Sequence, residues 1–336
     1  MEVVELKDGW GLEHVGIGER DARQPGPGEV AIEMRAVSLN YRDLVFVRGG
    51  YGPSGTLPRI LLSDGAGVVV AAGAGVSRVA VGDLVCPITS PAWLTGPIRE
   101  QYRDSMLGIS VDGVMADRIV ANAEAIVRVP KHFSAAEAAT LPCAAVTAWN
   151  ALVMAGTKSG DLVVTQGTGG VSLFALQFAR ALGATVVVTS SSEEKLQRAR
   201  AMGAQLGINY QRVPEWGKEL RRLTGGRGAD LVIEVGGAQT LPQSLRAVRA
   251  GGTVALIGVL SGGVAELELG RVVTQGLRLQ AVTIGPRDSF EAMIAFIEQH
   301  NLKPVIDERQ FSPPEIRAAI ATIGEGRHFG KLVIEL

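Results

Sequence analysis

The chain has 336 residues, a length that favours two domains, each large enough to bury a core of its own. Hydrophobic residues make up 46% and charged residues 20%, both close to the average of globular proteins, which argues against a disordered chain. The formal net charge of -1 gives no overall attraction to nucleic acid or to an anionic membrane, so we expect a small-molecule partner and no nucleic acid.

The N-terminal segment and the cysteine content bear on location and metal chemistry. The segment MEVVELKDGWGLEH has no basic region followed by an apolar run, and no apolar stretch approaches the roughly 18 residues of a membrane helix. We therefore expect a cytoplasmic protein that does not bind membranes. Cys86 and Cys143 are too few for a disulfide framework or a four-cysteine zinc site, and the four histidines show no metal-ligand spacing.

Three regions of different pattern follow one another along the chain. From about Val30 to Arg128, short β-rich runs punctuated by glycine predict a partly open barrel or sandwich. A helix is expected to begin near Ser134. Strands then alternate with helices, which predicts a doubly wound parallel sheet of six strands, at Leu162–Thr165, Thr185–Thr189, Leu206–Asn209, Leu231–Glu234, Thr253–Gly258 and Arg278–Thr283.

The last fifty residues return to mixed structure and finish with a short strand in HFGKLVIEL. We assign them to the first domain, so that 1–125 and 285–336 form one domain and 126–284 the other. This order of segments predicts a cleft between the two domains. The fold class is therefore α/β, with a β-rich domain beside a Rossmann-type parallel sheet.

A glycine-rich loop between the first parallel strand and the following helix is the candidate phosphate site. A tight turn, close approach of backbone amides to a pyrophosphate and close helix packing each require small residues. The third small position holds Ser172, one oxygen larger than alanine. A glycine cluster alone is weak evidence, but this one lies within repeated βα units, and it predicts dinucleotide binding by Gly167, Thr168, Gly169, Gly170 and Val171.

The end of the second parallel strand decides between NAD and NADP. An acidic residue there would bind the adenosine ribose and repel a 2′-phosphate. The position holds Ser190, followed by Ser191, Ser192 and, one turn into the helix, Lys195. Together with Tyr210 after the third strand, these side chains favour NADP(H) over NAD(H). The alternative is that the serines only cap the helix.

Taken together, the motifs resemble the medium-chain dehydrogenase/reductase superfamily over essentially the whole length, and in particular its zinc-free branch of quinone oxidoreductases and enoyl reductases. The resemblance is carried by VSLNYRDLVFVRGGYG, LSDGAGVVVAAGAGVSRVAVGDLV, LPCAAVTAWNALV, GTGGVS, GADLVIEVGG, GGTVALIGV and GRHFGKLVI. It implies a GroES-like catalytic domain with a Rossmann cofactor domain, and a homodimer joined through the strand near Thr253–Val259.

The resemblance also implies that a catalytic zinc is absent. In zinc-containing members the metal ligands lie in segments that match LNYRD, LLSDGAG and LPCAAVTAW, and here the corresponding residues are Asn40, Ser63 and Cys143. One thiolate does not replace three protein ligands. Without a metal, the favourable hydride acceptor is a conjugated system whose charge spreads onto an oxygen, as in quinones and α,β-unsaturated carbonyl compounds.

The remaining candidate residues follow from the same resemblance. Tyr51 matches the tyrosine of enoyl reductases and Tyr41 is a second proton donor, although solvent can also protonate an enolate. Asn40 and Thr147 match contacts to the nicotinamide ribose, and Asn40 counts among the catalytic candidates. Arg42 and Asp43 are expected to form a structural ion pair. The nicotinamide is expected to meet Gly258, Val259 and Leu260.

Lys331 is expected either to close over the cofactor or to be a surface lysine. Trp93 and Tyr102, in the segment 89–113, are expected near the cleft, where Arg99 and Arg103 meet an anionic substrate or face solvent. Two alternatives to a quinone or enone reductase stay open: an alcohol dehydrogenase of the same superfamily, and an NADPH-binding protein without catalytic activity.

Overall fold

The structure of the protein is a computed structural model that describes residues 1–51 and 56–336. The chain divides into two compact units, Met1–Val146 with Ile284–Leu336, and Thr147–Thr283. Each unit is described separately below.

The first unit is built on antiparallel strands, as the β-rich pattern predicts. A six-stranded sheet has the order β15-β3-β5-β6-β8, with β7 also paired to β3, and a three-stranded sheet has the order β2-β1-β4. The strands are β1 (Glu2–Leu6), β2 (Val15–Glu19), β3 (Glu29–Ser38), β4 (Arg59–Ile60), β5 (Asp64–Ala72), β6 (Leu84–Pro87), β7 (Arg118–Asn122), β8 (Ile126–Arg128) and β15 (Val333–Glu335).

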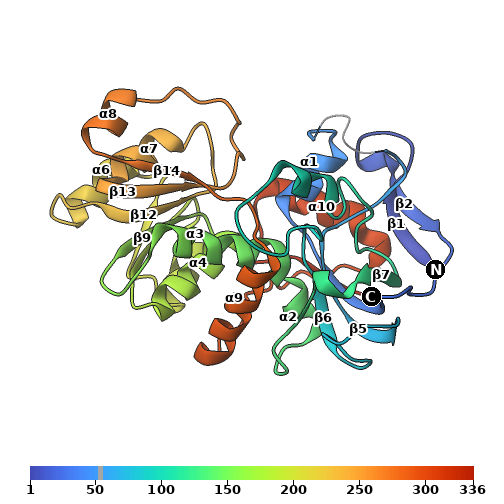
Figure 1. The fold of residues 1–336 in the computed structure, drawn as a ribbon. Helices are drawn as coiled ribbons and strands as arrows, with labels where there is room; N and C mark the ends of the chain where they lie inside the picture. Colours follow the sequence, from blue (N-terminus) through green and yellow to red (C-terminus); the bar gives the residue numbers. More distant parts are fainter. Residues whose placement is uncertain (52–55) are drawn as a thin grey trace. The chain divides into compact units, whose positions relative to one another are not determined.

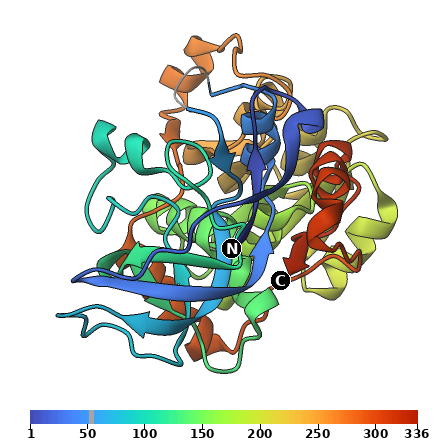
Figure 2. The same ribbon diagram turned by 90° about the vertical axis from the view of Figure 1, so that its right-hand side faces the viewer.

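The strand β3 is the centre of this unit because it pairs with β5, β7 and β15. Two bulges interrupt its register with β5, and a Cβ on Gly67 would lie 2.3 Å from the Glu33 carbonyl oxygen, so this close crossing requires glycine. Figure 2 shows the last segment of the chain, drawn in red, beside the blue N-terminal strands. This pairing places the end of the chain in the first unit, as expected.

Four α-helices of the first unit, α1 (Tyr41–Val47), α2 (Ala135–Ala139), α9 (Arg287–His300) and α10 (Ile316–Glu325), accompany these sheets. Helix α1 lies against α10, and α2 lies on β3 and β5. Buried aliphatic and aromatic side chains such as Ile32, Phe46 and Ile320 form the core between them. Burial of this apolar surface is the main stabilising contribution to the unit.

The second unit is the doubly wound parallel sheet that the alternating pattern predicts. Its strands have the order β11-β10-β9-β12-β13-β14, and all pairs are parallel. The strands are β9 (Leu162–Gln166), β10 (Thr185–Ser190), β11 (Leu206–Asn209), β12 (Ala229–Glu234), β13 (Val248–Leu256) and β14 (Arg278–Ala281). The strand order reverses between β9 and β12, and ligands bind beyond the carboxyl ends of strands at such a switch point.

The helices of the second unit are α3 (Val146–Ala155), α4 (Gly170–Ala181), α5 (Glu193–Ala201), α6 (Trp216–Leu223), α7 (Leu241–Ala247) and α8 (Leu269–Thr274). Figure 1 shows α6 and α7 on one side of the sheet and α3 and α4 on the other. A core of valines and leucines, including Val164, Val187 and Val232, lies in the centre of the sheet. Strands that are buried on both faces explain the continuous apolar runs in the sequence.

Three details differ from the sequence predictions. The segment 126–146, predicted in the second domain, lies in the first unit because β8 pairs with β6 and α2 packs on its sheet. The single helix expected from Ser134 is interrupted by a π-helical turn at Leu141–Ala145. There, Pro142 has no N–H to donate.

The third difference concerns the expected dimer contact. The strand near Thr253–Val259 is β13, which is paired on both sides, with β12 and with β14. It therefore has no free edge and cannot extend the sheet into a second subunit. The edge strands of this sheet are β11 and β14.

Candidate functional site

The loop after β9 has the backbone geometry that a pyrophosphate site requires. Gly167 has a φ of 71°, in the left-handed region, and its N–H donates to the Thr189 carbonyl oxygen over 2.7 Å. A Cβ at Gly167 would meet nothing within 4 Å, so the space beside this glycine is open. Gly169 is the N-cap of α4 and provides no side-chain cap, which leaves the first amides of the helix available to an anion.

Ser172, the unexpected residue of the fingerprint, fits because its hydroxyl has an internal partner. The side chain is buried, at 2% exposure, and its Oγ donates to the Gln166 carbonyl oxygen over 2.5 Å. The hydroxyl thus satisfies the last carbonyl of β9 while the helix stays close to the strand. Serine at this position is compatible with a dinucleotide loop.

A closed polar network joins the ends of β9 and β12. Gln166 Nε2 donates to Glu234 Oε2 and to Ser244 Oγ, in both cases over 2.7 Å. The other carboxylate oxygen of Glu234 accepts from the N–H groups of Gly236 and Gly237 and from the Thr240 hydroxyl. Both carboxylate oxygens of Glu234 therefore accept hydrogen bonds within the protein, so this buried acid stabilises the fold.

The end of β10 presents the serines that the sequence pattern singled out. Ser190 is 3% exposed and its Oγ accepts from the Ser192 N–H, while Ser192 is the N-cap of α5 and accepts from the Lys195 N–H. Two of the three hydroxyls therefore shape the turn and the helix start, as the capping alternative expects. Ser191 is exposed, and Tyr210, whose N–H donates to the Ser190 carbonyl oxygen, is 42% exposed.

The remaining predicted cofactor residues of the second unit lie after β13 and in α3. Gly258 follows β13, and a Cβ there would lie 2.1 Å from the Val235 carbonyl oxygen, so only glycine fits. Val259 and Leu260 are exposed, at 59% and 48%. Thr147 lies in the first turn of α3 and is buried.

In the first unit, Asn40 and Lys331 form a buried polar pair. Lys331 is 3% exposed, and its Nζ donates to the Leu39 carbonyl oxygen over 2.6 Å and to Asn40 Oδ1 over 2.5 Å. The expectation of a surface lysine is therefore wrong. Because an ammonium only donates, the oxygen of the Asn40 amide must face Lys331, and Nδ2 faces elsewhere, buried and without a partner among the described residues.

The residues at the three positions that match zinc ligands are engaged with one another. Ser63 Oγ donates to Asp64 Oδ1 over 2.7 Å, the Cys143 N–H in the π-helical turn donates to Asp64 Oδ2 over 3.0 Å, and Lys331 Nζ lies 4.0 Å from Oδ2. Burial, with Asp64 nearby, raises the pKa of the Cys143 thiol to about 12.

This donor set does not fit a zinc ion. The Asn40 oxygen accepts from an ammonium, Ser63 is a poor ligand, and the single thiol of Cys143 does not replace three protein ligands. Within residues 1–51 and 56–336, no group of three His, Cys, Asp or Glu side chains is arranged to hold a metal.

Arg42 lies in the same cluster and was not predicted to have a functional role. The expected ion pair with Asp43 is not formed, because the Asp43 carboxylate instead accepts from the Asn40 N–H over 2.7 Å. The terminal nitrogens of Arg42 are buried and have no hydrogen-bond partner in the described part of the chain. Burial would lower the pKa of Arg42, but Cys143, Asp43, Tyr51 and Asp64 raise it above its ordinary value.

The two tyrosines expected to donate a proton have different surroundings. Tyr41 packs against the hydrophobic core of the first unit. Tyr51 is 36% exposed, and burial of its hydroxyl raises the pKa of the phenol, while Arg42 opposes this rise through its charge and as a side-chain hydrogen-bond neighbour. The Tyr51 phenol therefore stays protonated at neutral pH and can donate a hydrogen bond, which favours Tyr51 over Tyr41 as the donor.

An aromatic pair adjoins this cluster. Trp93 and Tyr102 are stacked, with ring centroids 5.5 Å apart, and form a small apolar cluster with Ile284 against which Cys143 packs. These two rings therefore lie beside Cys143 within the first unit, and their expected place at a cleft stays a prediction. Arg99 and Arg103 are exposed.

A strained backbone precedes Ser63 and Asp64. Leu62 has a φ of 66°, a conformation that L-residues rarely adopt. Gly108 and Gly113 lie against it, because a Cβ on either would approach the Leu62 backbone to within 2.8 Å and 2.2 Å. No sequence pattern marks Leu62, whereas the buried glycines 108 and 113 are a signal of close backbone approach.

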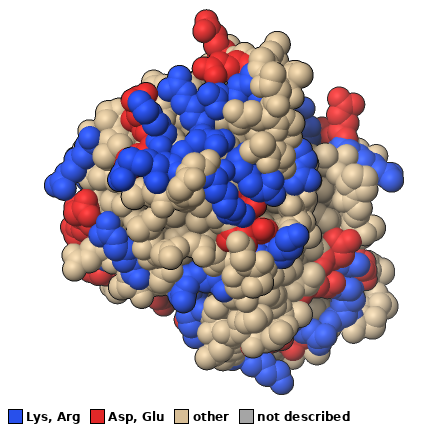
Figure 3. Space-filling view, turned by 90° about the vertical axis from the view of Figure 1, so that its left-hand side faces the viewer, with Lys and Arg blue, Asp and Glu red and all other residues tan. Residues whose placement is uncertain are grey.

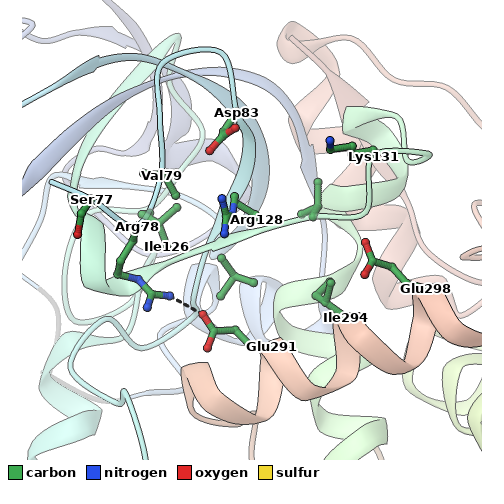
Figure 4. A pocket seen from close by; sticks show the side chains of 12 residues that line it. Ser77, Arg78, Val79, Asp83, Ile126, Arg128, Lys131, Glu291, Ile294 and Glu298 are labelled. Carbon is green, nitrogen blue, oxygen red and sulfur yellow. Dashed lines mark hydrogen bonds and ion pairs between the residues drawn. The ribbon is translucent and has the colours of Figure 1, made fainter.

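A separate hollow of about 650 Å³ lies elsewhere in the first unit. Figure 4 shows its lining of mixed charges, in which the guanidinium of Arg78 pairs with Glu291 of α9. None of the predicted site residues lines it. The first unit therefore has its candidate site at the buried cluster around Asn40 and Asp64, and the second unit has its own at the glycine-rich loop after β9.

Comparisons with known proteins identify both domains of the chain as dehydrogenase domains. Residues 26–131 match the family model of the alcohol dehydrogenase GroES-like domain, and residues 170–299 match that of zinc-binding dehydrogenases. A zinc-type alcohol dehydrogenase-like protein of Schizosaccharomyces pombe is 39% identical over 92% of this chain and 91% of its own length. The chain belongs to the medium-chain dehydrogenase/reductase superfamily, a family of oxidoreductases.

Two solved structures have the same fold over the whole chain. One is named an NAD-dependent alcohol dehydrogenase, with 32% identity, a TM-score of 0.91 and coverage of 100% of both chains. The other is a quinone oxidoreductase of Pseudomonas syringae, with 26% identity, a TM-score of 0.83 and coverage of 100% of this chain and 99% of the other. Within the described residues, no helix is long and apolar enough to cross a membrane.

Proposed function

We propose that the protein is an NADP(H)-dependent oxidoreductase that reduces quinones or α,β-unsaturated carbonyl compounds without a catalytic metal. The observation that carries the proposal is the buried cluster of the first unit. It combines unpartnered hydrogen-bond donors, Asn40 Nδ2 and the Arg42 nitrogens, with a set of residues that does not fit zinc. Such donors suit an oxygen that becomes negatively charged during reduction.

The cofactor proposal rests on the second unit. Ser190 takes the place of the acid that would repel a 2′-phosphate, and Ser191, Lys195 and Tyr210 belong to the same turn region. Between residues 147 and 283, fourteen Lys and Arg outnumber nine Asp and Glu. Figure 3 shows Lys and Arg gathered on the face toward which α6, α7 and α8 lie. An overall positive charge attracts anionic ligands, whereas the discrimination of a 2′-phosphate rests on Ser190.

The residues have separable tasks in the proposed reaction. The loop 167–171 and the first amides of α4 hold the pyrophosphate, and Asn40 and Thr147 contact the nicotinamide ribose. When bound, the reduced nicotinamide supplies a hydride. Lys331 holds the Asn40 amide in one orientation, and Tyr51 donates a hydrogen bond or a proton to the reduced product.

The test is the oxidation of NADPH and of NADH by purified protein with a panel of quinones, enones and simple aldehydes, together with elemental analysis of its zinc content. We expect turnover with quinones or enones, a preference for NADPH, and activity that persists after treatment with a chelator. Stoichiometric zinc, or turnover of aldehydes only, would contradict the proposal.

The second candidate function is a dehydrogenase of alcohols that uses NAD(H), favoured by the names of the Schizosaccharomyces pombe relative and of one solved structure. Oxidation of primary and secondary alcohols with NAD⁺ would support it. The donor set around Asp64 argues against it, because an alkoxide would then lack a metal to stabilise its charge.

A homodimer and a cytoplasmic location remain proposals. We propose that the dimer contact lies at the free edge of β14 and near helix α8. Val264, Leu269 and Val273 in this region are 93%, 65% and 77% exposed. Light scattering after size exclusion should give twice the mass of one chain. In a Leu269→Arg variant the mass should fall to that of a single chain at low concentration.

A further inference from the structure

Arg42 is a half-buried residue that contributes two of the unpartnered donors of the buried cluster. It is the second residue of α1, and both terminal nitrogens of its guanidinium are shielded from solvent. Within the described residues neither nitrogen has a hydrogen-bond acceptor. Buried donors are almost always paired in native proteins, and an unpaired charged donor is costly, so its retention needs an explanation.

The acids around Arg42 do not supply that acceptor because they are committed elsewhere. Asp64 accepts from the Ser63 hydroxyl and the Cys143 N–H, and Asp43 accepts from the Asn40 N–H. These carboxylates influence the guanidinium only through their charge. The guanidinium therefore keeps its positive charge while its donors stay available.

A ligand that brings an anionic oxygen would complete this site. The neighbouring donors belong to the same cluster. Asn40 Nδ2 also lacks a partner, and the Tyr51 hydroxyl lies beside the guanidinium, which acts on it through its charge and as a side-chain hydrogen-bond neighbour, although the two groups do not form a well-aligned hydrogen bond. A planar guanidinium suits such an oxygen because it offers several N–H groups in fixed directions. The Lys331 ammonium is not an alternative, since it is bound to Leu39 and Asn40.

We propose that the Arg42 guanidinium binds an anionic oxygen of the substrate, namely the carbonyl oxygen on which negative charge collects during reduction. This inference rests on the proposed reduction of conjugated carbonyl compounds. Arg42 then acts on the reacting atoms directly, and acceptors whose product is an enolate or a hydroquinone anion are preferred. A permanent carboxylate elsewhere on the substrate is the other source of the same anionic oxygen.

The electron balance explains why a cation is useful at this place. Hydride, with its electron pair, forms a new C–H bond at the carbon β to the carbonyl. The alkene π pair becomes the double bond between the α-carbon and the carbonyl carbon, and the carbonyl π pair moves to oxygen. The nicotinamide is oxidised and the acceptor is reduced. A proton from Tyr51 or solvent then completes the product, and the cation is needed only while oxygen carries the charge.

The test compares Arg42→Gln and Arg42→Lys with wild type, and uses Arg48→Gln as the control, because Arg48 is an exposed arginine at the other end of α1. Acceptors are p-benzoquinone, the methyl ester of 4-oxo-2-pentenoic acid and the free acid of the same compound. For Arg42→Gln we expect kcat to fall on the order of 100-fold with quinone and ester, while KM for NADPH stays within about 2-fold. Arg42→Lys should recover part of the loss.

The ester and acid pair separates the two sources of negative charge. A loss in kcat with both compounds assigns Arg42 to the reacting oxygen. A rise in KM confined to the free acid assigns it to a permanent carboxylate and still supports an anion-binding guanidinium. Unchanged kinetics of Arg42→Gln with every acceptor would overturn the inference.

Two readouts do not depend on turnover. Formate should bind to the NADP⁺-loaded wild-type protein in isothermal titration calorimetry and bind about 10-fold more weakly to Arg42→Gln, with chloride as the ionic-strength control. Equal binding, or no binding to wild type, would overturn the inference. Formate binding through Arg42 in a protein that reduces none of the acceptors would refute the proposed reaction and leave this assignment standing.

Thermal unfolding separates a binding role from a structural one. Removal of an unpaired buried charge should leave the melting temperature of Arg42→Gln equal to that of wild type or higher. A melting temperature several degrees lower, together with normal formate binding, would show that Arg42 serves the fold and would contradict the proposal.

Discussion

Two buried polar networks of the protein differ in one respect, which is whether their donors and acceptors are all used. In the second unit, Gln166, Glu234 and Ser244 satisfy one another and the turn after β12. In the first unit, Asn40 Nδ2 and the Arg42 nitrogens are left without partners among the described residues. A closed network maintains a scaffold, whereas an open one is arranged for a group that the chain does not supply.

The largest loss of stability is expected when the hydrogen bonds of Glu234 in the second unit are removed. Glu234→Ala removes the acceptor for three side chains and two backbone N–H groups, and should lower the free energy of unfolding by about 3–5 kcal/mol. Denaturant titration measures this change. The control Glu268→Ala removes an exposed acid and should stay within about 0.5 kcal/mol. A loss below about 1 kcal/mol for Glu234→Ala would show that the network is not structural.

Removal of Lys331, which holds Asn40 in the open network of the first unit, should lower both the stability of the protein and its affinity for NADPH. Lys331→Met leaves Asp64 and the Asn40 oxygen without their cation, and should lower the free energy of unfolding by about 2–4 kcal/mol. Because Asn40 is then free to reorient, KM for NADPH should rise about 10-fold. Lys7→Met, at an exposed position, is the control. A stable variant with unchanged KM would exclude a positioning role for Lys331.

A carboxylate at the end of β10 should reverse the cofactor preference. Ser190→Asp brings negative charge to the position that favours a 2′-phosphate, so kcat/KM for NADPH should fall on the order of 100-fold while that for NADH is maintained or rises. Steady-state kinetics with both cofactors measure the change, with Ser77→Asp in the first unit as a charge-matched control. Equal losses for both cofactors would indicate damage to the turn instead of a change in recognition.

The last comparison concerns the change of stability per unit of pH, which is small at any one pH. Burial raises the pKa of Asp43 from 3.8 to about 7, although Arg42, Lys331 and the Asn40 N–H lower it and Asp64 raises it further. Between these two pH values the folded chain holds a proton that the unfolded chain has lost, so the contribution of Asp43 to stability falls as pH rises through this window.

Asp43→Asn should remove that decline, which has a slope of at most about 1.4 kcal/mol per pH unit. Thermal or denaturant unfolding of wild type and variant across the same window gives the comparison. Asp21→Asn, at an exposed position, should show no such difference. Parallel pH profiles for Asp43→Asn and wild type would mean that Asp43 is ionised in the folded protein throughout.

The second unit could be predicted closely because its signals are local. Strand positions follow from apolar runs between helical segments, and the boundaries of β11 coincide with the predicted Leu206–Asn209. The exception is informative: β13 was expected at a subunit contact, but its position between β12 and β14 depends on pairing that no local pattern reports.

The candidate site of the first unit could be predicted only in part. The resemblance to known dehydrogenases pointed to Asn40, Ser63 and Cys143, yet the partners of these residues come from distant parts of the chain. Lys331 lies 291 positions from Asn40, and its burial has no signature in the surrounding sequence. Arg42 was assigned to an ion pair with its neighbour because adjacent opposite charges suggest one, whereas the helix start directs the Asp43 carboxylate to the Asn40 N–H.

The pairing of β15 with β3 also determines the order in which the protein can mature on the ribosome. Strand β3 leaves the ribosome early, but its partner β15 and the ammonium that holds Asn40 are translated after the entire parallel sheet. The parallel sheet can therefore fold while the first unit still waits for its last segment. Until β15 is translated, the nascent chain exposes one edge of β3, and an unpaired strand edge is a place where chains can aggregate.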